Sequence, residues 1–567
     1  MDTNTNMSFS RMRVKLLRAT TKVRQALTAL KAKSKAKCST AVLSDDLWHL
    51  TLASPQLKIR DLAAASTVCR ALRALAADDV VWQAAYARRW QGNSAHATGQ
   101  SSDATGWRQR YQVAHRIDST LWACGLRAQP TLGDDGPHSF NDTPPGAATL
   151  PETDEAAAPQ QVVCGGLRFS QAVPGLRHFL AVATPASLPE AALCPEGTLY
   201  SWGSPRDARG TINRASLGWP TSGPQVDLPS ICPWWKPSRA NVTAPGGIDQ
   251  LAIGGEQQCA LVRLGEVYLF GRSCKTHELE LRVPTIMTLP PGVKVASVSL
   301  GYDHSLLVDQ AGRLHAAGGN SRGELGLGDF GDRTNNFVLV EDVVPAGMRV
   351  IAAAAGMSHS LTMSSAGTVY ASGCNKAGQL GLDILEAEVS HFTEVVALPR
   401  VTAVSAGFNL SAVIASDGGV FTFGQGNEGG LGHGAEFMSP ITWSTWSPPR
   451  RVAALASERV VSVAVGGGHM VALTASGAVY TWGNNDSGQC GRAMTKLDFR
   501  HSAIGRGKDR LGLKGHSKYT PGRVPLPGVA RSVSAGDETT FMILGPPPNE
   551  QSAAHVTSML GGGQSPW

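Results

Sequence analysis

The feature that most constrains this chain is a short apolar run, bounded by glycines, that recurs along most of its length. One copy is GAVYTWG at 477–483, and the β-branched and aromatic residues between its glycines predict a short strand. The other copies are GTLYSWG (197–203), GEVYLFG (265–271), GRLHAAG (312–318), GTVYASG (367–373) and GGVFTFG (418–424). Self-similarity of this kind is typical of repeat folds and decides the architecture before any local prediction does.

A second strand-like signature precedes each of these runs. Its copies are GLRHFLAVA from Gly175, GEQQCALV from Gly255, GYDHSLLV from Gly301, GMSHSLTM from Gly356, GFNLSAVI from Gly407 and GHMVAL within 466–473. The short segments between a signature and its run, such as SAG and SDG, favour hairpin turns. A turn-rich third element follows several runs, for example NKAGQLGL at 375–382.

The patterned region is incomplete at both of its ends. GDETTFMILG at 536–545 has no strand after it, whereas STLWACG at 119–125 has no signature before it. Joining these two halves makes a seventh unit and pairs the edges that an open array would expose. We therefore predict an all-β, seven-bladed β-propeller over residues 118–545, closed by pairing of strand 119–125 with 529–544.

These three motifs together closely resemble the repeat of the regulator of chromosome condensation family, over roughly residues 118–545. The first two units depart from it, because their third element is eroded to SPRDARGTINRAS and RSCKTHELEL. The repeated glycines are expected to serve tight turns and the close packing of neighbouring blades.

Residues 41–115 are of a different kind. The stretch 42–90 contains no glycine and has the periodicity of three short helices, a small bundle that gains stability by burying an apolar face against a partner. The ordered motifs Leu-x-Asp-Asp-Leu, Ile-Arg-Asp-Leu, Ser-x-Val-Cys-Arg and Asp-Asp-x-x-Trp resemble an F-box. Ser44 and Leu72 depart from that pattern, since F-boxes usually have proline and often tryptophan there.

The F-box resemblance implies an adaptor: the helices dock on a Skp-family linker held by a cullin, and the C-terminal domain presents a protein substrate for ubiquitylation. The residues that it implies for linker docking are Leu43, Leu47, Leu62, Val68, Cys69, Leu72 and Trp82. The alternative is that these side chains form the core of a helical cap on the propeller.

Loops that interrupt the repeat are the expected place for substrate specificity. They are 127–160; 204–247, with Trp234 and Trp235; and 492–523, with Arg506, Lys508 and Arg510. The tryptophans fit a recognition hot spot or a plug for an irregular blade edge, and the basic loop fits an acidic partner or a solvated insert.

Charge is concentrated at the start of the chain. The net charge is +7, and residues 1–40 alone hold ten Lys or Arg against the single acid Asp2. This extension fits a nuclear address, an organelle presequence, contact with nucleic acid or membrane, or a solvated tail that is helical or disordered. Residues 546–567 are expected to be a disordered tail.

The chain is expected to lie in the cytoplasm or nucleus, with organelle targeting by residues 1–40 left open. No apolar run is long enough to span a membrane. The ten cysteines include no CxxC pair, which favours buried free thiols such as Cys124, Cys259, Cys374 and Cys490 in a reducing compartment.

No catalytic motif stands out in the sequence. His178, His304, His359 and His469 recur at one place in the repeat, so we expect a structural role, with each imidazole bonded to a turn carbonyl. Phosphate-loop, nucleophile-elbow and HExxH motifs are missing. We therefore expect a non-enzymatic adaptor without cofactor or metal; the alternatives are a Ran-type guanine-nucleotide exchange or chromatin-binding propeller, and a scaffold without ubiquitin chemistry.

Ultraviolet perception, as in the related plant photoreceptor, is disfavoured. That activity needs clustered tryptophans after the signature glycines. The positions concerned hold Leu176, Glu256, Tyr302, Met357, Phe408, Gly467 and Asp537.

Overall fold

The computed structural model divides the chain into two units, Met1–Asp118 and Ser119–Trp567. All described residues belong to the second unit. They are 119–125, 159–162, 168–175, 178–183, 198–203, 226–231, 248–255, 258–272, 280–287, 289–331, 334–384, 386–426, 428–434, 448–492 and 517–545. No helix among them is long and apolar enough to cross a membrane.

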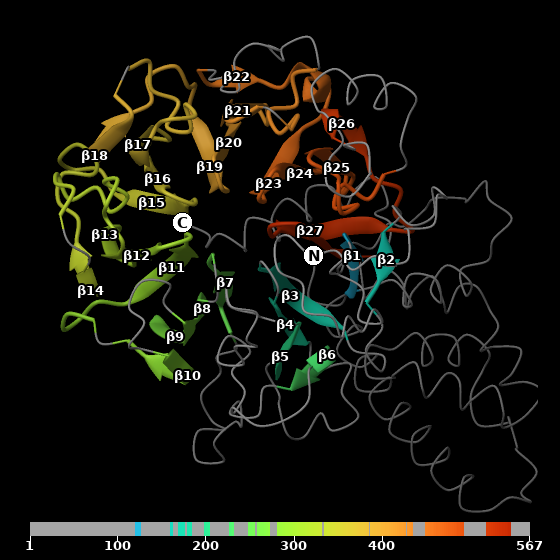
Figure 1. The fold of residues 1–567 in the computed structure, drawn as a ribbon, viewed down its shortest axis with the longest axis horizontal. Coiled ribbons are helices and arrows are strands. Elements are labelled where there is room, and N and C mark those ends of the chain that lie inside the picture. The colour runs from blue at the N-terminus through green and yellow to red at the C-terminus, as the bar shows by residue number, and fades with distance from the viewer. Residues whose placement is uncertain are drawn as a thin grey trace, which may run out of the picture. The chain divides into compact units, whose positions relative to one another are not determined.

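The described residues form seven antiparallel sheets of four strands each, arranged as blades around a central axis (Figure 1). Blade 1 contains β3 (Phe169–Pro174), β4 (His178–Ala183), β5 (Thr198–Gly203) and β6 (Val226–Ile231). Blade 2 contains β7 (Gln250–Ile253), β8 (Gln258–Arg263), β9 (Glu266–Arg272) and β10 (Glu280–Ile286). Blade 3 contains β11 (Val295–Leu300), β12 (His304–Asp309), β13 (Leu314–Gly318) and β14 (Thr334–Leu339).

The remaining blades follow the same plan. Blade 4 contains β15 (Val350–Ala355), β16 (His359–Ser364), β17 (Val369–Cys374) and β18 (Glu388–Glu394). Blade 5 contains β19 (Val401–Ala406), β20 (Leu410–Ala415), β21 (Val420–Gly424) and β22 (Arg450–Arg451), and a 3-10 turn at Ala453–Leu455 follows it. Blade 6 contains β23 (Val460–Val465), β24 (His469–Thr474), β25 (Val479–Gly483) and β26 (Lys518–Arg523). The prediction of a seven-bladed, all-β propeller is confirmed for the described part of the chain.

Blade 7 joins the two ends of the patterned region. It contains β27 (Val529–Ala535) and β28 (Thr540–Gly545) from one end, and β1 (Thr120–Cys124) and β2 (Gln160–Gln161) from the other. Strand β1 pairs with β28 in antiparallel register, with Leu121 opposite Ile543 and Ala123 opposite Phe541. The glycine-bounded strand 119–125 thus completes the signature strand of 536–545, and the ring has no unpaired break there.

The hydrophobic core lies between neighbouring blades. The second strand of a blade is covered on both faces, and every residue of β12, β16, β20 and β24 is buried. At the closing interface, Phe179 and Trp202 of blade 1 pack on Phe541 of blade 7, and the rings of Trp202 and Phe541 are stacked with centroids 5.8 Å apart. Aromatic packing of this kind adds to the area buried. Closure therefore rests on side chains as well as on strand pairing.

The innermost strands carry polar contacts from one blade to the next. The Gln250 side chain bonds both the N–H and the C=O of Val298, each at 3.0 Å, and Ser534 Oγ donates to the carbonyl of Ala172 at 2.7 Å. The first strand of each blade lies closest to the axis (Figure 1), so these contacts link the blades around the centre of the ring.

The signature glycines make the closest contacts between blades, except that in blade 2 this glycine is Gly254, one position before the Gly255 with which the sequence signature begins. We call them the ring glycines: Gly175, Gly254, Gly301, Gly356, Gly407, Gly466 and Gly536. In six of the seven, a Cβ would collide with the carbonyl oxygen of the ring glycine in the next blade. The residue after a ring glycine uses that approach: Met357 N–H donates to Gly407 O at 2.9 Å, and Gly255 N–H to Gly301 O at 2.9 Å. The expectation that the glycines allow close blade packing is confirmed at these positions.

Replacing a ring glycine by alanine should destabilise the propeller. In Gly356→Ala the new Cβ would lie 2.5 Å from the Gly407 oxygen and would also collide with the His359 ring. We expect the free energy of unfolding to fall by about 2 kcal/mol or more. The guanidinium midpoint, followed by tryptophan fluorescence, measures this. Gly331→Ala is the matched control, because its nearest neighbour is an aspartate side chain at 3.4 Å, and an equal loss in both variants would contradict the prediction.

Candidate protein-binding face

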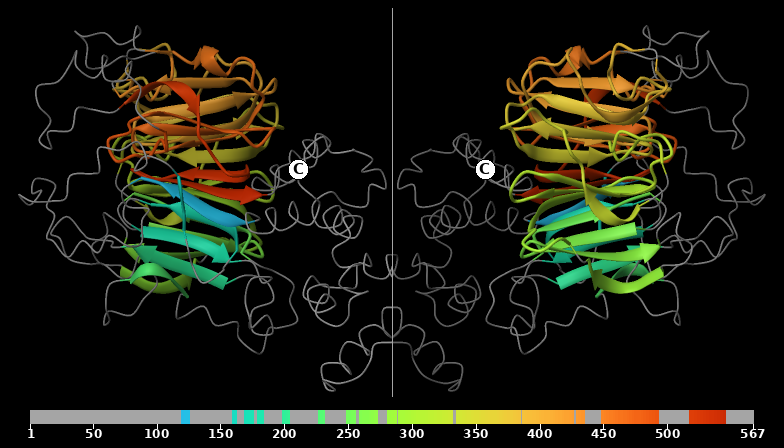
Figure 2. Two further views of the ribbon diagram at one scale, coloured as in Figure 1. Left: turned by 90° about the vertical axis from the view of Figure 1, so that its right-hand side faces the viewer. Right: turned by 90° about the vertical axis from the view of Figure 1, so that its left-hand side faces the viewer.

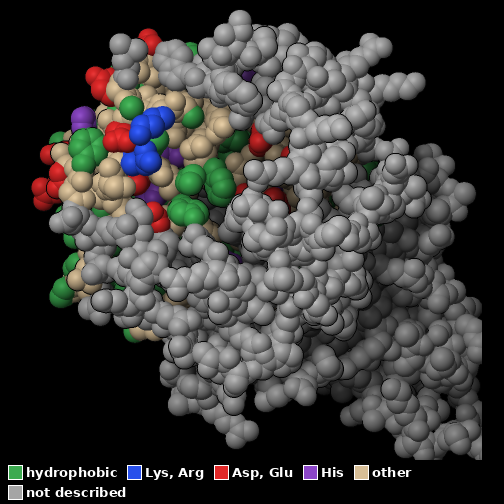
Figure 3. Space-filling view, in the orientation of Figure 1, with side chains coloured by type: hydrophobic (Ala, Val, Ile, Leu, Met, Phe, Trp, Pro, Cys, Tyr) green, Lys and Arg blue, Asp and Glu red, His purple; other side chains and the backbone are tan. Residues whose placement is uncertain are grey.

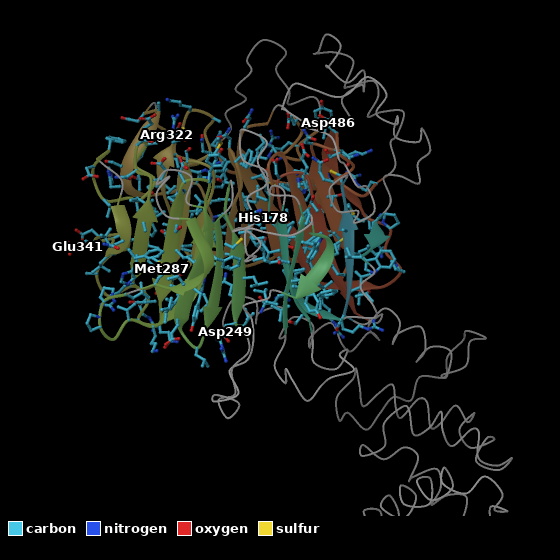
Figure 4. The ribbon with its side chains drawn as sticks, turned by 60° about the horizontal axis from the view of Figure 1, so that its bottom comes forward. His178, Asp249, Met287, Arg322, Glu341 and Asp486 are labelled. Atoms are coloured by element: carbon cyan, nitrogen blue, oxygen red, sulfur yellow. The ribbon has the colours of Figure 1, made fainter. Side chains whose placement is uncertain are left out.

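The strands run across the thickness of the ring (Figure 2), so the connections gather on two faces. The upper face carries the turns between the first and second strands and the loops between the third and fourth. The lower face carries the turns between the second and third strands and the connections from blade to blade. In Figure 4, Arg322 and Asp486 mark the upper face and Asp249 marks the lower one.

The residues that the sequence singles out for binding lie outside the described residues. This holds for the linker-docking set Leu43, Leu47, Leu62, Val68, Cys69, Leu72 and Trp82, and for the loop residues Trp234, Trp235, Arg506, Lys508 and Arg510. The repeated histidines and the positions after most ring glycines are described.

Each repeated histidine reaches into the next blade, where its Nε2 meets a short side chain and not the turn carbonyl expected from the sequence. Nε2 of His304, His359 and His469 lies 2.9 Å from a hydroxyl oxygen, that of Ser360, Ser411 and Thr540 respectively. Nε2 of His178 lies 3.2 Å from the Cys259 thiol. The expected turn carbonyl is thus wrong as the direct partner of Nε2, because a short side chain of the neighbouring blade stands between the two.

Each hydroxyl in turn bonds a backbone carbonyl of the blade that carries the histidine, which completes a relay between the two blades. Ser360 donates to the Glu324 carbonyl at 2.6 Å, Ser411 to that of Gln379 at 2.7 Å, and Thr540 to that of Gln489 at 2.8 Å. A hydroxyl has one proton to donate, so it accepts from the imidazole N–H. The position that sequence reasoning missed is therefore the small polar residue directly after the histidine position, as in the HSL of GMSHSL.

Burial keeps the imidazoles of His178, His359 and His469 neutral. It lowers the pKa of His178 and of His469 to about 4, and lowers that of His359 to about 3, where the electrostatic interaction with His304 lowers it further. A neutral imidazole locked between blades serves as a structural clamp. Within the described residues no group of His, Cys, Asp and Glu is arranged to hold a metal.

The thiols behave in the same structural way. Cys124, Cys259, Cys374 and Cys490 are buried thiols that form no disulfide, as expected from the sequence. Burial raises the pKa of Cys124 far above its usual range, which keeps this thiol protonated and unreactive.

The upper mouth of the ring is the described surface best suited to a protein ligand. We define it by Tyr302, Met357, Phe408 and Asp537, which directly follow ring glycines, together with Glu428. Tyr302 and Phe408 are partly exposed, and their rings meet edge to face with centroids 6.5 Å apart, although they come from blades 3 and 5. Figure 3, which views this face, shows hydrophobic side chains close to the ring axis with acidic ones beside them.

Two glycines make room for the carboxylates of the upper mouth. A Cβ at Gly467 would collide with Asp537 Oδ1, and one at Gly468 would lie 2.5 Å from Glu428 Oε2. The same Glu428 oxygen accepts from Asn484 at 2.9 Å. The upper mouth thus joins an apolar side, from blades 3 to 5, to an acidic side, from blades 5 to 7.

Removing one relay hydroxyl should lower the free energy of unfolding, and it leaves the exposed surface of the propeller unchanged because the hydroxyl is buried. Ser411→Ala leaves the His359 N–H and the Gln379 carbonyl without their shared partner, and we expect a loss of about 1–3 kcal/mol in the free energy of unfolding. Ser416→Ala, at an exposed turn position of the same blade, is the control and should change stability little. Equal denaturation midpoints for the two variants would contradict the relay.

The clamps also predict how stability depends on pH. The folded pKa values of about 3 and 4 lie below the unfolded value of 6.5, so the unfolded state binds more protons in acid. The contribution of each histidine to the free energy of unfolding is complete above pH 6.5. It declines as the pH falls toward the folded pKa, and at pH 5 it is lower by about 2 kcal/mol per histidine. The thermal midpoint should therefore fall less between pH 7.5 and 5 in His359→Gln than in the parent; an equal fall would count against the prediction.

Comparison with known proteins places the repeats in a family. The model for the "Regulator of chromosome condensation (RCC1) repeat" matches residues 417–473 and 476–543, and a second RCC1-repeat model matches 295–324 and 460–489. These matches lie within blades 3 and 5 to 7.

Two curated relatives are similar in sequence to part of this chain. The mouse probable E3 ubiquitin-protein ligase HERC4 is 31% identical over 217 residues, which are 38% of this chain and 20% of that protein. The ultraviolet-B receptor UVR8 of Arabidopsis thaliana is 29% identical over 253 residues, 43% of this chain and 54% of the receptor. The chain thus spans about a fifth of the length of HERC4.

Solved structures share the fold. Human WBSCR16 superposes with a TM-score of 0.55 at 20% identity, covering 75% of this chain and 98% of that one. Prp20p from Saccharomyces cerevisiae superposes with a TM-score of 0.56 at 18% identity, covering 80% and 98%. With the repeat matches, the chain thus carries RCC1 repeats in blades 3 and 5 to 7, and its described residues form a seven-bladed β-propeller.

Proposed function

We propose that this chain is the substrate-recognition adaptor of a cullin-type ubiquitin ligase. In this proposal residues 41–115 dock on a Skp-family linker, and the propeller binds the protein to be ubiquitylated. The docking half is supported by the ordered F-box-like motifs from Leu43 to Trp82. The presence of RCC1 repeats in HERC4, named as a probable E3 ubiquitin-protein ligase, is consistent with this role.

The observation that carries the binding half is the upper mouth. Its rigid frame is suited to presentation, because the imidazoles and hydroxyls around it are engaged in contacts between blades. Tyr302, Met357 and Phe408 offer aromatic and thioether surface, and Asp537 with Glu428 offers negative charge beside it. This pairing fits a substrate segment with a basic side chain next to apolar ones.

Photoreception and nucleotide exchange are the competing functions of this propeller type. The described positions after the ring glycines hold no tryptophan, which argues against a UVR8-like role. Binding to Gsp1p and histones is a property of Prp20p. The likeness of that protein to this chain, at 18% identity, concerns the fold, so exchange stays an outcome of the test below.

Co-purification tests the adaptor proposal directly. A Skp-family linker and a cullin should be retained by the intact chain and lost from Leu62→Asp, Val68→Asp, since a carboxylate in an apolar docking surface costs several kcal/mol of binding. Phe330→Asp, an exposed apolar site on the propeller, is the matched control and should retain both proteins. Failure of the intact chain to retain a linker would overturn the proposal and turn attention to GTPase exchange or scaffolding.

A double variant of the upper mouth separates substrate capture from linker docking. Tyr302→Ser, Phe408→Ser should lose the proteins whose ubiquitylation depends on the chain and should keep the linker. Unchanged ubiquitylation targets in this variant would contradict the assignment of the upper mouth. Thermal unfolding of each variant checks that the propeller is intact.

A further inference from the structure

The lower face carries a basic side chain at one repeated position. In four consecutive blades the residue immediately before the first strand is Lys or Arg, and all four side chains are exposed: Lys294, Arg349, Arg400 and Arg459. Arg168 stands at the same place in blade 1. Because the first strands surround the axis, these residues form an arc around the lower end of the ring (Figure 1).

Two turns hold each basic residue in place. Its backbone carbonyl bonds the turn between the second and third strands of its own blade, and its side-chain stem rests on a glycine of the same turn in the preceding blade. The Arg400 carbonyl accepts from Ser416 N–H at 2.9 Å, and the carbonyls of Arg349 and Lys294 accept from Ser365 and Gln310, both at 2.8 Å. The side-chain stems rest on turn glycines: a Cβ at Gly367, whose φ is +83°, would lie 2.6 Å from Arg400 Cγ. Gly265, Gly312 and Gly418 meet the stems of Lys294, Arg349 and Arg459 in the same way.

The charged ends of these residues are available to a partner. Among the described residues, none of Lys294, Arg349, Arg400 and Arg459 forms an ion pair. Several acids of this face already have partners: Asp309 binds Arg313 and His315, and Asp417 binds Arg451. Glu458 accepts from the Tyr480 hydroxyl at 2.9 Å. Glu341 lies at the outer edge of the propeller (Figure 4).

Exposed apolar side chains lie close in sequence to the cations of this face or to the turns that hold them. Met348 and Ile351 lie on either side of Arg349 in the chain and are 40% and 45% exposed. Leu264, beside the glycine on which Lys294 rests, is 49% exposed, and Val396, on the connection leading to Arg400, is 83% exposed. Large hydrophobic side chains gathered on one face mark an interaction surface more often than isolated ones do.

We propose that this lower face binds an acidic segment of a partner protein that also carries apolar side chains. Carboxylates would pair with Arg349, Arg400 and their neighbours, while Met348, Ile351 and Val396 would bury apolar groups between them. A nucleic acid would use the charges but would gain little from aliphatic neighbours, since single strands are held by stacking on aromatic rings. The surface lies opposite the upper mouth and is independent of the adaptor proposal, so each can fail alone.

Fluorescence anisotropy with defined probes tests this proposal on the full chain. The main probe is a labelled peptide of about 16 residues that mixes Glu with Leu and Phe; the comparison probes are a Glu/Ser peptide of equal charge, a (dT) oligonucleotide of equal charge, and vesicles containing phosphatidylserine. We expect the Glu/Leu/Phe peptide to bind most tightly. Arg349→Glu, Arg400→Glu should weaken it by about tenfold or more, and Met348→Ser, Ile351→Ser by about threefold or more.

The matched control reverses two charges on the opposite face. Arg322→Glu, Lys376→Glu should change the affinity of the peptide by less than about twofold. The proposal is overturned if the main probe does not bind, if the control weakens binding as much as Arg349→Glu, Arg400→Glu does, or if the Glu/Ser peptide, the oligonucleotide or the vesicles bind as tightly. Thermal unfolding of all three double variants ensures that a loss of binding reflects the surface.

Discussion

The propeller depends on the close approach of glycine backbones around its axis. At Gly301, Gly356 and Gly466 a side chain would collide with both the next blade's carbonyl and the imidazole three residues on. One residue type thus allows two contacts at once: the hydrogen bond from blade to blade, and the buried histidine that reaches the next hydroxyl. Because a missing Cβ is the only way to satisfy both, the glycine and the histidine recur together in the sequence.

Closure of the ring depends on strands from both ends of the patterned region. Six blades are each made from one continuous segment, but the seventh needs β1 and β2 from the start of the patterned region to complete β27 and β28. Strand β1 therefore links residues that are more than four hundred positions apart, and the stacked Trp202 and Phe541 bury the seam beside it. Such long-range pairing has a large loop-closure entropy cost, which the contacts with the neighbouring blades offset once those blades are formed.

The sequence could predict the ring because its signals are local and repeated. Glycine-bounded strands and the GxxH signature each lie within one blade, and their count and incomplete ends suffice for seven blades. The partner of the histidine could not be found in this way, since Ser411 lies 52 positions from His359 and belongs to another unit of the pattern. The upper mouth was equally hidden: Tyr302 and Phe408 meet only because blades 3 and 5 curve around one axis.

The two faces of the ring differ because different parts of the repeat build them. On the upper face the residue after each ring glycine varies freely, from Tyr302 to Asp537, since only its backbone N–H is needed for blade contacts. On the lower face the corresponding position is the one before the first strand, where in four blades the side-chain stem lies over a glycine of the preceding blade and its end is exposed. Long basic residues fit this position and bring charge to the surface. The blade contacts that hold the ring together therefore use the backbone and the stem of these residues, so the exposed ends of their side chains can differ between chains with this fold without disturbing the core.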